Sequence, residues 1–135
     1  MAELTAPPKF TPPNGVLLVA FDGADAVGCV GLRTLEPGVG EVRHMWVHDR
    51  MRRSGLGRRM LREIEAQAVT LGLPTLRLNT HKALPEAVAM YRAAGYAESG
   101  AYSDEVHAQL SFLKRLSPSR DQPEDSARVT ARRSR

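Results

Sequence analysis

The chain changes its hydrophobic period within residues 47–61, whose letters are VHDRMRRSGLGRRML. Upstream of this stretch, apolar and β-branched residues occur in short blocks that are typical of strands. Downstream, Leu56, Met60 and Ile64 recur at the spacing of one helix face. A Gly-Leu-Gly turn stands at the change. A strand that runs through a glycine turn into a helix restricts the chain to folds that pack helices against a sheet.

Five arginines surround this turn in the same stretch. The first turn of a helix has unpaired backbone N–H groups and a partial positive charge, so arginines beside it create a receptor for an anion. The turn lacks the Gly-Lys-Ser/Thr ending of a nucleotide triphosphatase loop and the third glycine of a dinucleotide fingerprint. Three interpretations stay open at this point: the phosphates of a nucleotide-like cofactor, a nucleic-acid backbone, or a solvated rim without a ligand.

Apolar runs and turn residues predict elements in the order β-β-β-α-β-α-β-β. The expected strands are residues 15–21, 27–34, 41–48, 75–80, 96–102 and 108–116, and the expected helices are residues 56–71 and 84–95. This order combines an antiparallel meander with a right-handed β-α-β crossover. We therefore expect an α/β (α+β) fold with a mixed, mostly antiparallel sheet flanked by helices.

At 135 residues the chain is long enough for one domain with its own core. We expect a proline-rich lead at 1–14, the folded domain at 15–116 and a disordered tail at 117–135, which is rich in Pro, Ser and Arg. The tail holds five arginines and three acidic residues, which accounts for half of the net charge of +4. The folded part is thus only mildly basic, which disfavours a nucleic-acid partner.

No stretch approaches the roughly 18 to 20 continuous apolar residues of a membrane span, so we expect no membrane partner. The first letters, MAELTAPPKFTPPNG, carry an acid and prolines where an export signal has its apolar region, which predicts a cytoplasmic protein. The single cysteine, Cys29, excludes an internal disulfide, and the histidines have no metal-ligand spacing with it or with one another. We expect no metal site.

Two motifs resemble those of the GNAT superfamily of acetyl-coenzyme A (acetyl-CoA) dependent N-acetyltransferases. The family's central motif, Arg/Gln-x-x-Gly-x-Gly/Ala after a strand, is matched by Arg52, Gly55 and Gly57. Its later pattern is Ala-x-x-x-Tyr-x-x-x-Gly-Phe/Tyr. The matching residues of that pattern are Ala87, Tyr91, Gly95 and Tyr96. The resemblance covers residues 15–116 and implies an enzyme that transfers the acetyl group of acetyl-CoA to a primary amine.

By this resemblance the cosubstrate is acetyl-CoA, and the anion at the turn is its pyrophosphate. The residues whose backbone would line the acetyl and pantetheine arm are Met45, Trp46 and Val47. The residues that would hold the pyrophosphate are Arg52, Arg53, Ser54, Gly55, Leu56, Gly57 and Arg58. A helix start that follows a strand of a mixed sheet independently favours an anionic cofactor at this place.

The resemblance also implies two catalytic residues. Tyr91 would donate a proton to the thiolate of CoA; the alternative is a core tyrosine whose hydroxyl is hydrogen-bonded. Glu41 lies eleven residues before Arg52, the spacing at which several GNAT enzymes place a glutamate base. The alternative for Glu41 is a solvated glutamate at the start of a strand. Other relatives place the base where this chain has Asn79, and an amide cannot act as a base at neutral pH.

The start of the chain departs from the family pattern. GNAT domains usually begin with a strand and two helices, and the residues before the first predicted strand are too few to hold them. We therefore expect an exposed apolar face near the first hairpin and a homodimer that covers it. A non-catalytic acyl-CoA-binding or interaction subunit is the main alternative. A nucleic-acid-binding module is less favoured, because the arginines are not interleaved with aromatic residues and Trp46 is expected in a strand core.

Overall fold

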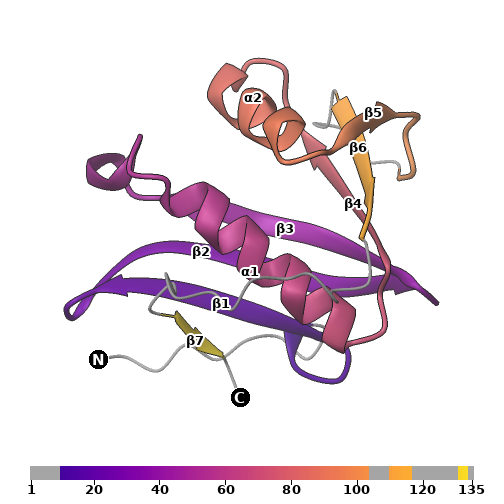
Figure 1. Ribbon diagram of the computed structural model, residues 1–135, viewed down its shortest axis with the longest axis horizontal. Helices are drawn as coiled ribbons and strands as arrows, with labels where there is room; N and C mark the ends of the chain where they lie inside the picture. The colour runs from indigo at the N-terminus through magenta and orange to yellow at the C-terminus, as the bar shows by residue number, and fades with distance from the viewer. Residues whose placement is uncertain (1–9, 104–109, 117–130, 134–135) are drawn as a thin grey trace.

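The computed structural model describes residues 10–103, 110–116 and 131–133 of the chain (Figure 1). Within these ranges seven strands form one sheet in the order β5-β6-β4-β3-β2-β1-β7. The strands are β1 (Gly15–Asp22), β2 (Asp25–Glu36), β3 (Val39–Val47), β4 (Thr75–Thr80), β5 (Ala97–Ser99), β6 (Leu110–Arg115) and β7 (Ala131–Arg133). The helices are α1 (Leu56–Thr70) and α2 (Pro85–Ala93), with a short 3-10 helix at Asp49–Met51. The predicted fold class is confirmed.

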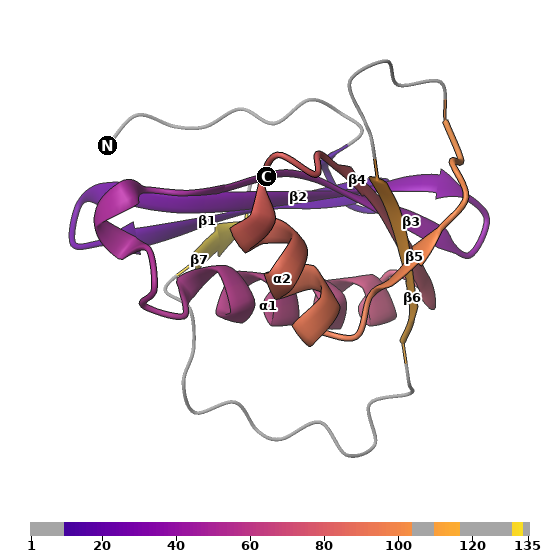
Figure 2. The same ribbon diagram turned by 90° about the horizontal axis from the view of Figure 1, so that it is seen from above.

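Neighbouring strands in the sheet are antiparallel except β3 and β4, which run parallel. Helix α1 connects this parallel pair, and α2 connects β4 to β5. Both connections move across the sheet in the same direction, so right-handed crossovers put both helices on one face. Figure 2 shows α1 and α2 on the same side of the sheet. We call the other side, on which the described residues form no α-helix, the helix-free face.

The core lies between the helices and the sheet. Helix α1 buries Leu56, Met60 and Ile64, as their spacing predicts, together with Leu61 and Ala68. Facing them, the strand side chains Leu32, Leu76 and Phe112 have no exposed surface. The core packs so closely that two strand positions need glycine. A Cβ on Gly28 would lie 2.9 Å from Met60 Cε of the helix, and one on Gly40 would lie 2.8 Å from Leu32 Cδ1 of the neighbouring strand.

The ends of the chain take more part in the fold than the sequence predicts. Phe10, within the predicted lead, is only 2% exposed. Its ring occupies the space where a side chain on Gly31 would lie, since a Cβ there would come 3.1 Å from Phe10 Cε1. In the predicted disordered tail, Ala131–Arg133 pairs with β1, because the free edge of a strand offers hydrogen bonds to any backbone. The rest of the tail, residues 117–130 and 134–135, lies outside the described residues.

The exposed apolar face that we expect near the first hairpin is not found in the part of the chain that the structure describes. There the large apolar side chains with high exposure are Trp46, Val69 and Leu84, and none of them belongs to β1 or β2. Val19 of β1 is only 4% exposed, and the buried Phe10 shows that the segment before β1 shields part of this face. No helix within the described ranges is long and apolar enough to cross a membrane.

Candidate active site

The parallel strands β3 and β4 pair over a short length and then separate. Their paired residues are Val39 with Thr75, Gly40 with Leu76, and Glu41 with Arg77. Beyond Glu41, β3 stays paired with β2, and beyond Arg77, β4 stays paired with β6. We call this separation, between Val42–Val47 of β3 and Leu78–Thr80 of β4, the fork; Figure 1 shows the two strands diverging there. From Met45 to Val47, the side of β3 that faces the fork is not paired with any strand among the described residues, so its backbone groups can bind a ligand.

A bulge reshapes β3 along the fork. His44 has a φ of 60°, and the register between β2 and β3 shifts between Cys29 and Gly31. The Cys29 thiol donates to the His44 carbonyl at 3.1 Å, and burial raises the pKa of this thiol. Trp46 then pairs with Cys29 on the helix-free face and remains 47% exposed. The expectation that Trp46 lies in a strand core is therefore wrong, because no helix covers that face.

The glycine turn opens α1 as the sequence predicts. Gly55 is the N-cap with a φ of 87°, a left-handed conformation that favours glycine. The Ser54 hydroxyl accepts a hydrogen bond from the Leu56 N–H at 3.2 Å, and the Gly55 carbonyl accepts from Arg59 at 3.1 Å. No acceptor within the described residues meets the N–H groups of Gly57 and Arg58. These two donors are positioned to receive an anion at the helix start.

The three arginines predicted to hold the pyrophosphate fall into two groups. Arg52 pairs with Asp49 at 3.2 Å and reaches Glu86 of α2 at 4.0 Å. Arg53 and Arg58 are exposed, and neither forms an ion pair with any residue of the described ranges. The first group ties the turn to α2, whereas the second leaves two guanidinium groups for a ligand with several negative charges.

Helix α2 closes the site from its other side. A Cβ on Gly57 would lie 2.9 Å from Met90 Sδ and 3.6 Å from Val47 Cγ2. Gly57 therefore lies where the end of β3, the start of α1 and the middle of α2 meet. Met45 and Val47 are partly buried against the core at the same place. The residues predicted to bind the acetyl-CoA arm and the pyrophosphate are thus brought together.

Tyr91 faces the core from α2. It is 5% exposed, and its ring packs edge-on against Tyr96 at 5.9 Å and tilted against Phe112 at 6.3 Å. Burial raises the pKa of Tyr91 to about 12. Within the described ranges no hydrogen bond of its hydroxyl is found. The Tyr91 hydroxyl therefore stays protonated at neutral pH and can donate a hydrogen bond to a ligand.

Glu41 is not the solvated strand-start residue of the alternative interpretation, since it is 2% exposed. Arg33 Nε lies 2.6 Å and Arg43 Nη1 3.4 Å from Glu41 Oε1. The Tyr102 hydroxyl donates to Glu41 Oε2 at 2.6 Å. Burial by itself raises the pKa of Glu41, but the hydrogen bonds from Tyr102 and Arg33 and the charges of Arg33 and Arg43 outweigh it, so the pKa is lowered.

Residues 2–96 match the family model of the acetyltransferase (GNAT) family. The chain belongs to this family. A curated relative, an IAA acetyltransferase of Azospirillum brasilense, is 36% identical to this GNAT chain over 91 residues. That match covers 67% of the chain and 60% of the relative. The chain thus spans less than two thirds of the relative's length.

Solved structures share the GNAT fold with this chain. A GNAT family acetyltransferase of Staphylococcus aureus Mu50 has a TM-score of 0.72 at 16% identity, covering 80% of this chain and 72% of that one. A GNAT family acetyltransferase of Elizabethkingia anophelis with acetyl-CoA bound has a TM-score of 0.66 at 14% identity, covering 76% and 77%. At these identities the likeness concerns the fold.

The two catalytic candidates of this GNAT domain lie on opposite faces of the sheet. Tyr91 belongs to the core between the sheet and the helices. Gly40 faces that core, because a Cβ on it would contact Leu32, Leu73 and Leu76. Since strand side chains alternate, Glu41 points to the helix-free face. The partners of Glu41 are Arg33, Arg43 and Tyr102, and no motif in the sequence marks them as site residues.

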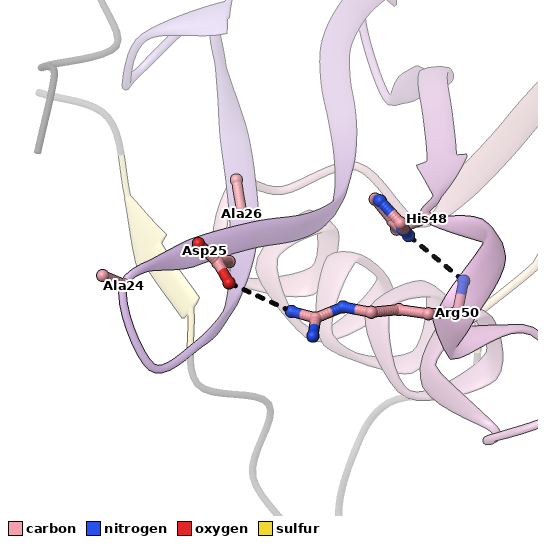
Figure 3. Close-up of a pocket in the computed structure, with 5 residues that line it drawn as sticks. All are labelled: Ala24, Asp25, Ala26, His48 and Arg50. Carbon is pink, nitrogen blue, oxygen red and sulfur yellow. Dashed lines mark hydrogen bonds and ion pairs between the residues drawn. The ribbon is translucent and has the colours of Figure 1, made fainter.

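A separate hollow of about 510 Å³ lies between the β1–β2 turn and the 3-10 helix, lined by Ala24, Asp25, Ala26, His48 and Arg50 (Figure 3). Arg50 Nη2 lies 3.3 Å from Asp25 Oδ2, and the His48 ring accepts from the Arg50 N–H at 3.1 Å. The hollow is open and its charges are matched, so it adds nothing to the GNAT site. No cluster of metal-ligating side chains occurs among the described residues.

Proposed function

We propose that this GNAT protein transfers the acetyl group of acetyl-CoA to a primary amine. The observation that carries the proposal is the fork in the sheet beside a helix start with free N–H donors and unpaired arginines. These features fit a ligand that is long, narrow and anionic at one end. The acetyl-CoA bound to the Elizabethkingia anophelis relative of the same fold supports this choice of cosubstrate.

Different residues of the chain would bind different parts of acetyl-CoA. The N–H groups of Gly57 and Arg58, with the guanidinium groups of Arg53 and Arg58, would hold the pyrophosphate. The backbone from Met45 to Val47 would hydrogen-bond the pantetheine arm along the fork. The Leu56 N–H donates to Ser54 Oγ, which shapes the turn, and Arg52 contacts Glu86 of α2 through an exposed ion pair.

The reaction needs a neutral amine, a stabilised oxyanion and a proton for the leaving sulfur. The amine nitrogen attacks the thioester carbonyl, the new C–N bond forms and the C–S bond breaks. Backbone N–H groups of β3 at the fork would stabilise the oxyanion. The Tyr91 hydroxyl would donate its proton to the departing thiolate and regain one from solvent; its raised pKa keeps the hydroxyl protonated at neutral pH but makes it a weaker acid.

The amine must also lose a proton, and Glu41 is the carboxylate that the sequence offers for this. Its lowered pKa keeps it ionised but makes it a weak base. Its oxygen Oε1 already accepts a hydrogen bond from Arg33, and Oε2 accepts one from Tyr102. We therefore propose that the proton passes mainly to solvent.

The proposal includes a cytoplasmic location, because acetyl-CoA is an intracellular metabolite. The homodimer stays a prediction of the sequence alone, since the exposed apolar face that motivates it is not found among the described residues. We test the activity by screening pools of primary amines with acetyl-CoA and following the mass gain of one acetyl group. The account predicts acetylation of at least one amine, strongly reduced in Tyr91→Phe. Tight acetyl-CoA binding without transfer to any amine would favour the non-catalytic acyl-CoA-binding subunit.

A further inference from the structure

We propose that Glu41 is a positioning residue: through Tyr102 it holds the segment Ser99–Ser103 against the fork, where this segment forms a wall of the acceptor site. The location of the acceptor site rests on the proposed acetyl transfer. The attachment of the segment rests on the contacts themselves. The two parts can therefore be tested separately.

The packing of the helices decides the side from which an acceptor can reach the fork. The glycine turn, α1 and α2 occupy one face of the sheet (Figure 2). The core fills the space beneath these helices. An acceptor therefore approaches from the helix-free face. On that face Glu41 and Arg77 form the last residue pair before the strands separate, so whatever contacts these two side chains borders the entrance.

The segment Ser99–Ser103 contacts both side chains of this pair. The Tyr102 hydroxyl donates to Glu41 at 2.6 Å. The Arg77 guanidinium lies over the Tyr102 ring at 4.7 Å and donates to Ser99 Oγ at 2.8 Å and to the Gly100 carbonyl at 3.1 Å. The segment is thus attached to the end of the fork at both of its ends.

A third attachment lies one step further along β4. The side-chain amide of Asn79 donates to Ser103 Oγ at 3.1 Å. The side-chain oxygen Oδ1 of Asn79 accepts from the Ser111 hydroxyl of β6 at 2.7 Å. Asn79 is two residues beyond Arg77 on the same strand, so it borders the fork itself. The position that lacks a carboxylate base thus serves as an anchor for the same segment.

The role of Glu41 follows from how its oxygens are used. Arg33 and Arg43 offset the cost of burying its charge, and its other oxygen binds Tyr102. Both oxygens are thus engaged in hydrogen bonds, and these bonds help to lower the pKa of the carboxyl, which makes it a weak base. Glu41 therefore acts on the acceptor through Tyr102, which is a role in binding and orientation.

The test compares Glu41→Gln, Tyr102→Phe and the double variant, using the best amine from the acceptor screen and CoA release as the signal. Tyr102→Phe keeps the ring over Arg77 and leaves the Glu41 ion pairs intact, so it folds even if Glu41→Gln is damaged. We expect each single variant to raise the acceptor KM about tenfold or more, the effect of one lost hydrogen bond to a charged group. The KM for acetyl-CoA should not change. The double variant should be no worse than Glu41→Gln alone.

The matched control is Tyr96→Phe. It removes another tyrosine–glutamate hydrogen bond, of 2.9 Å to Glu65, but one that lies on the helix side of the sheet. Its acceptor KM should equal that of the wild type. The proposal is overturned if Glu41→Gln lowers kcat at least a hundredfold and removes a low-pH limb of the rate profile while Tyr102→Phe behaves as wild type, since that pattern identifies a general base.

Hydrogen exchange of the amides at residues 100–103, followed by mass spectrometry, tests the attachment without any acceptor. Both Glu41→Gln and Tyr102→Phe should exchange these amides faster than Tyr96→Phe does. Unchanged exchange in both variants overturns the proposal, whatever the activity. If the protein transfers no acetyl group at all, the proposed function fails, and the exchange experiment still decides whether Glu41 holds the segment.

Discussion

Glu41 and Arg77 form the last residue pair between β3 and β4, and the two strands separate immediately beyond it. This pair divides the site into two sides. On the helix side lie the glycine turn and Tyr91, where we place acetyl-CoA and its proton donor. On the helix-free side lie Tyr102 and Asn79, where we place the acceptor. The gap between the separated strands would let acetyl-CoA on the helix side and the acceptor on the helix-free side come into contact.

Tyr91→Phe should slow transfer without weakening acetyl-CoA binding. The substitution keeps the ring that packs against Tyr96 and Phe112 and removes only the hydroxyl. Loss of a positioned acid typically costs on the order of 10² to 10⁴ in rate, and we expect the low end, because a thiolate is a good leaving group. Steady-state kinetics with Tyr96→Phe as the control measure this, and wild-type turnover in Tyr91→Phe would make Tyr91 a core residue only.

The pH profile should show no decline from Tyr91 below about pH 11. Its pKa is raised to about 12, so the hydroxyl keeps its proton through the ordinary working range. A raised pKa also means that its protonated form favours the folded state below pH 10, and that this stabilisation is lost as the pH rises toward 12. A decline of kcat centred near pH 10 that disappears in Tyr91→Phe would contradict this pKa.

Glu41→Gln should lower stability at pH 7 by about 1–3 kcal/mol, because it removes one partner of a buried ion pair whose arginines are partly exposed. The lowered pKa of Glu41 stabilises the fold above its unfolded-state pKa of about 4.3, and this contribution is lost as the pH falls through the folded-state pKa. Urea unfolding should therefore show the difference between variant and wild type shrinking at acidic pH. A difference that is constant from pH 7 to pH 3 would contradict the ion-pair account.

The two glycines of the turn should respond differently to alanine. Gly55 has a φ of 87°, and a Cβ at this position would have no atom within 4 Å, so Gly55→Ala should cost about 1–2 kcal/mol through backbone strain alone. Gly57 has an ordinary helical backbone, and its Cβ would meet only the flexible end of Met90 and Val47, so Gly57→Ala should cost less. Urea unfolding of the pair measures this, and a larger loss at Gly57 would contradict the geometry of the turn.

The hydrophobic pattern predicts the elements well because their burial is periodic. The spacing of Met60 and Ile64 alone places α1 against the sheet. Strand β7 has no such signal, since it pairs through its backbone at the edge of β1. The bulge at His44 is equally hidden, because a non-glycine residue with positive φ is held by tertiary contacts such as that of Cys29.

The cosubstrate side of the site could be predicted from local sequence, and the acceptor side could not. Residues 52–58 are neighbours in the chain and form one turn, so their sequence motif is enough to predict their arrangement. Glu41 and Tyr102 are far apart in the chain and meet only when β3, β4 and the segment after β5 come together. Arg33 is the one partner of Glu41 that the predicted pairing of β2 and β3 could have indicated, because it lies directly opposite Glu41.

Calorimetric titration with acetyl-CoA tests the central claim most directly. The account predicts saturable binding to the wild type and clearly weaker binding to Gly57→Glu, which puts a side chain and a negative charge where the pyrophosphate is received. Val69→Glu, at the exposed far end of α1, adds the same charge away from the site and should bind as the wild type does. No heat and no thermal shift with millimolar acetyl-CoA, or equal weakening in both variants, would contradict the account.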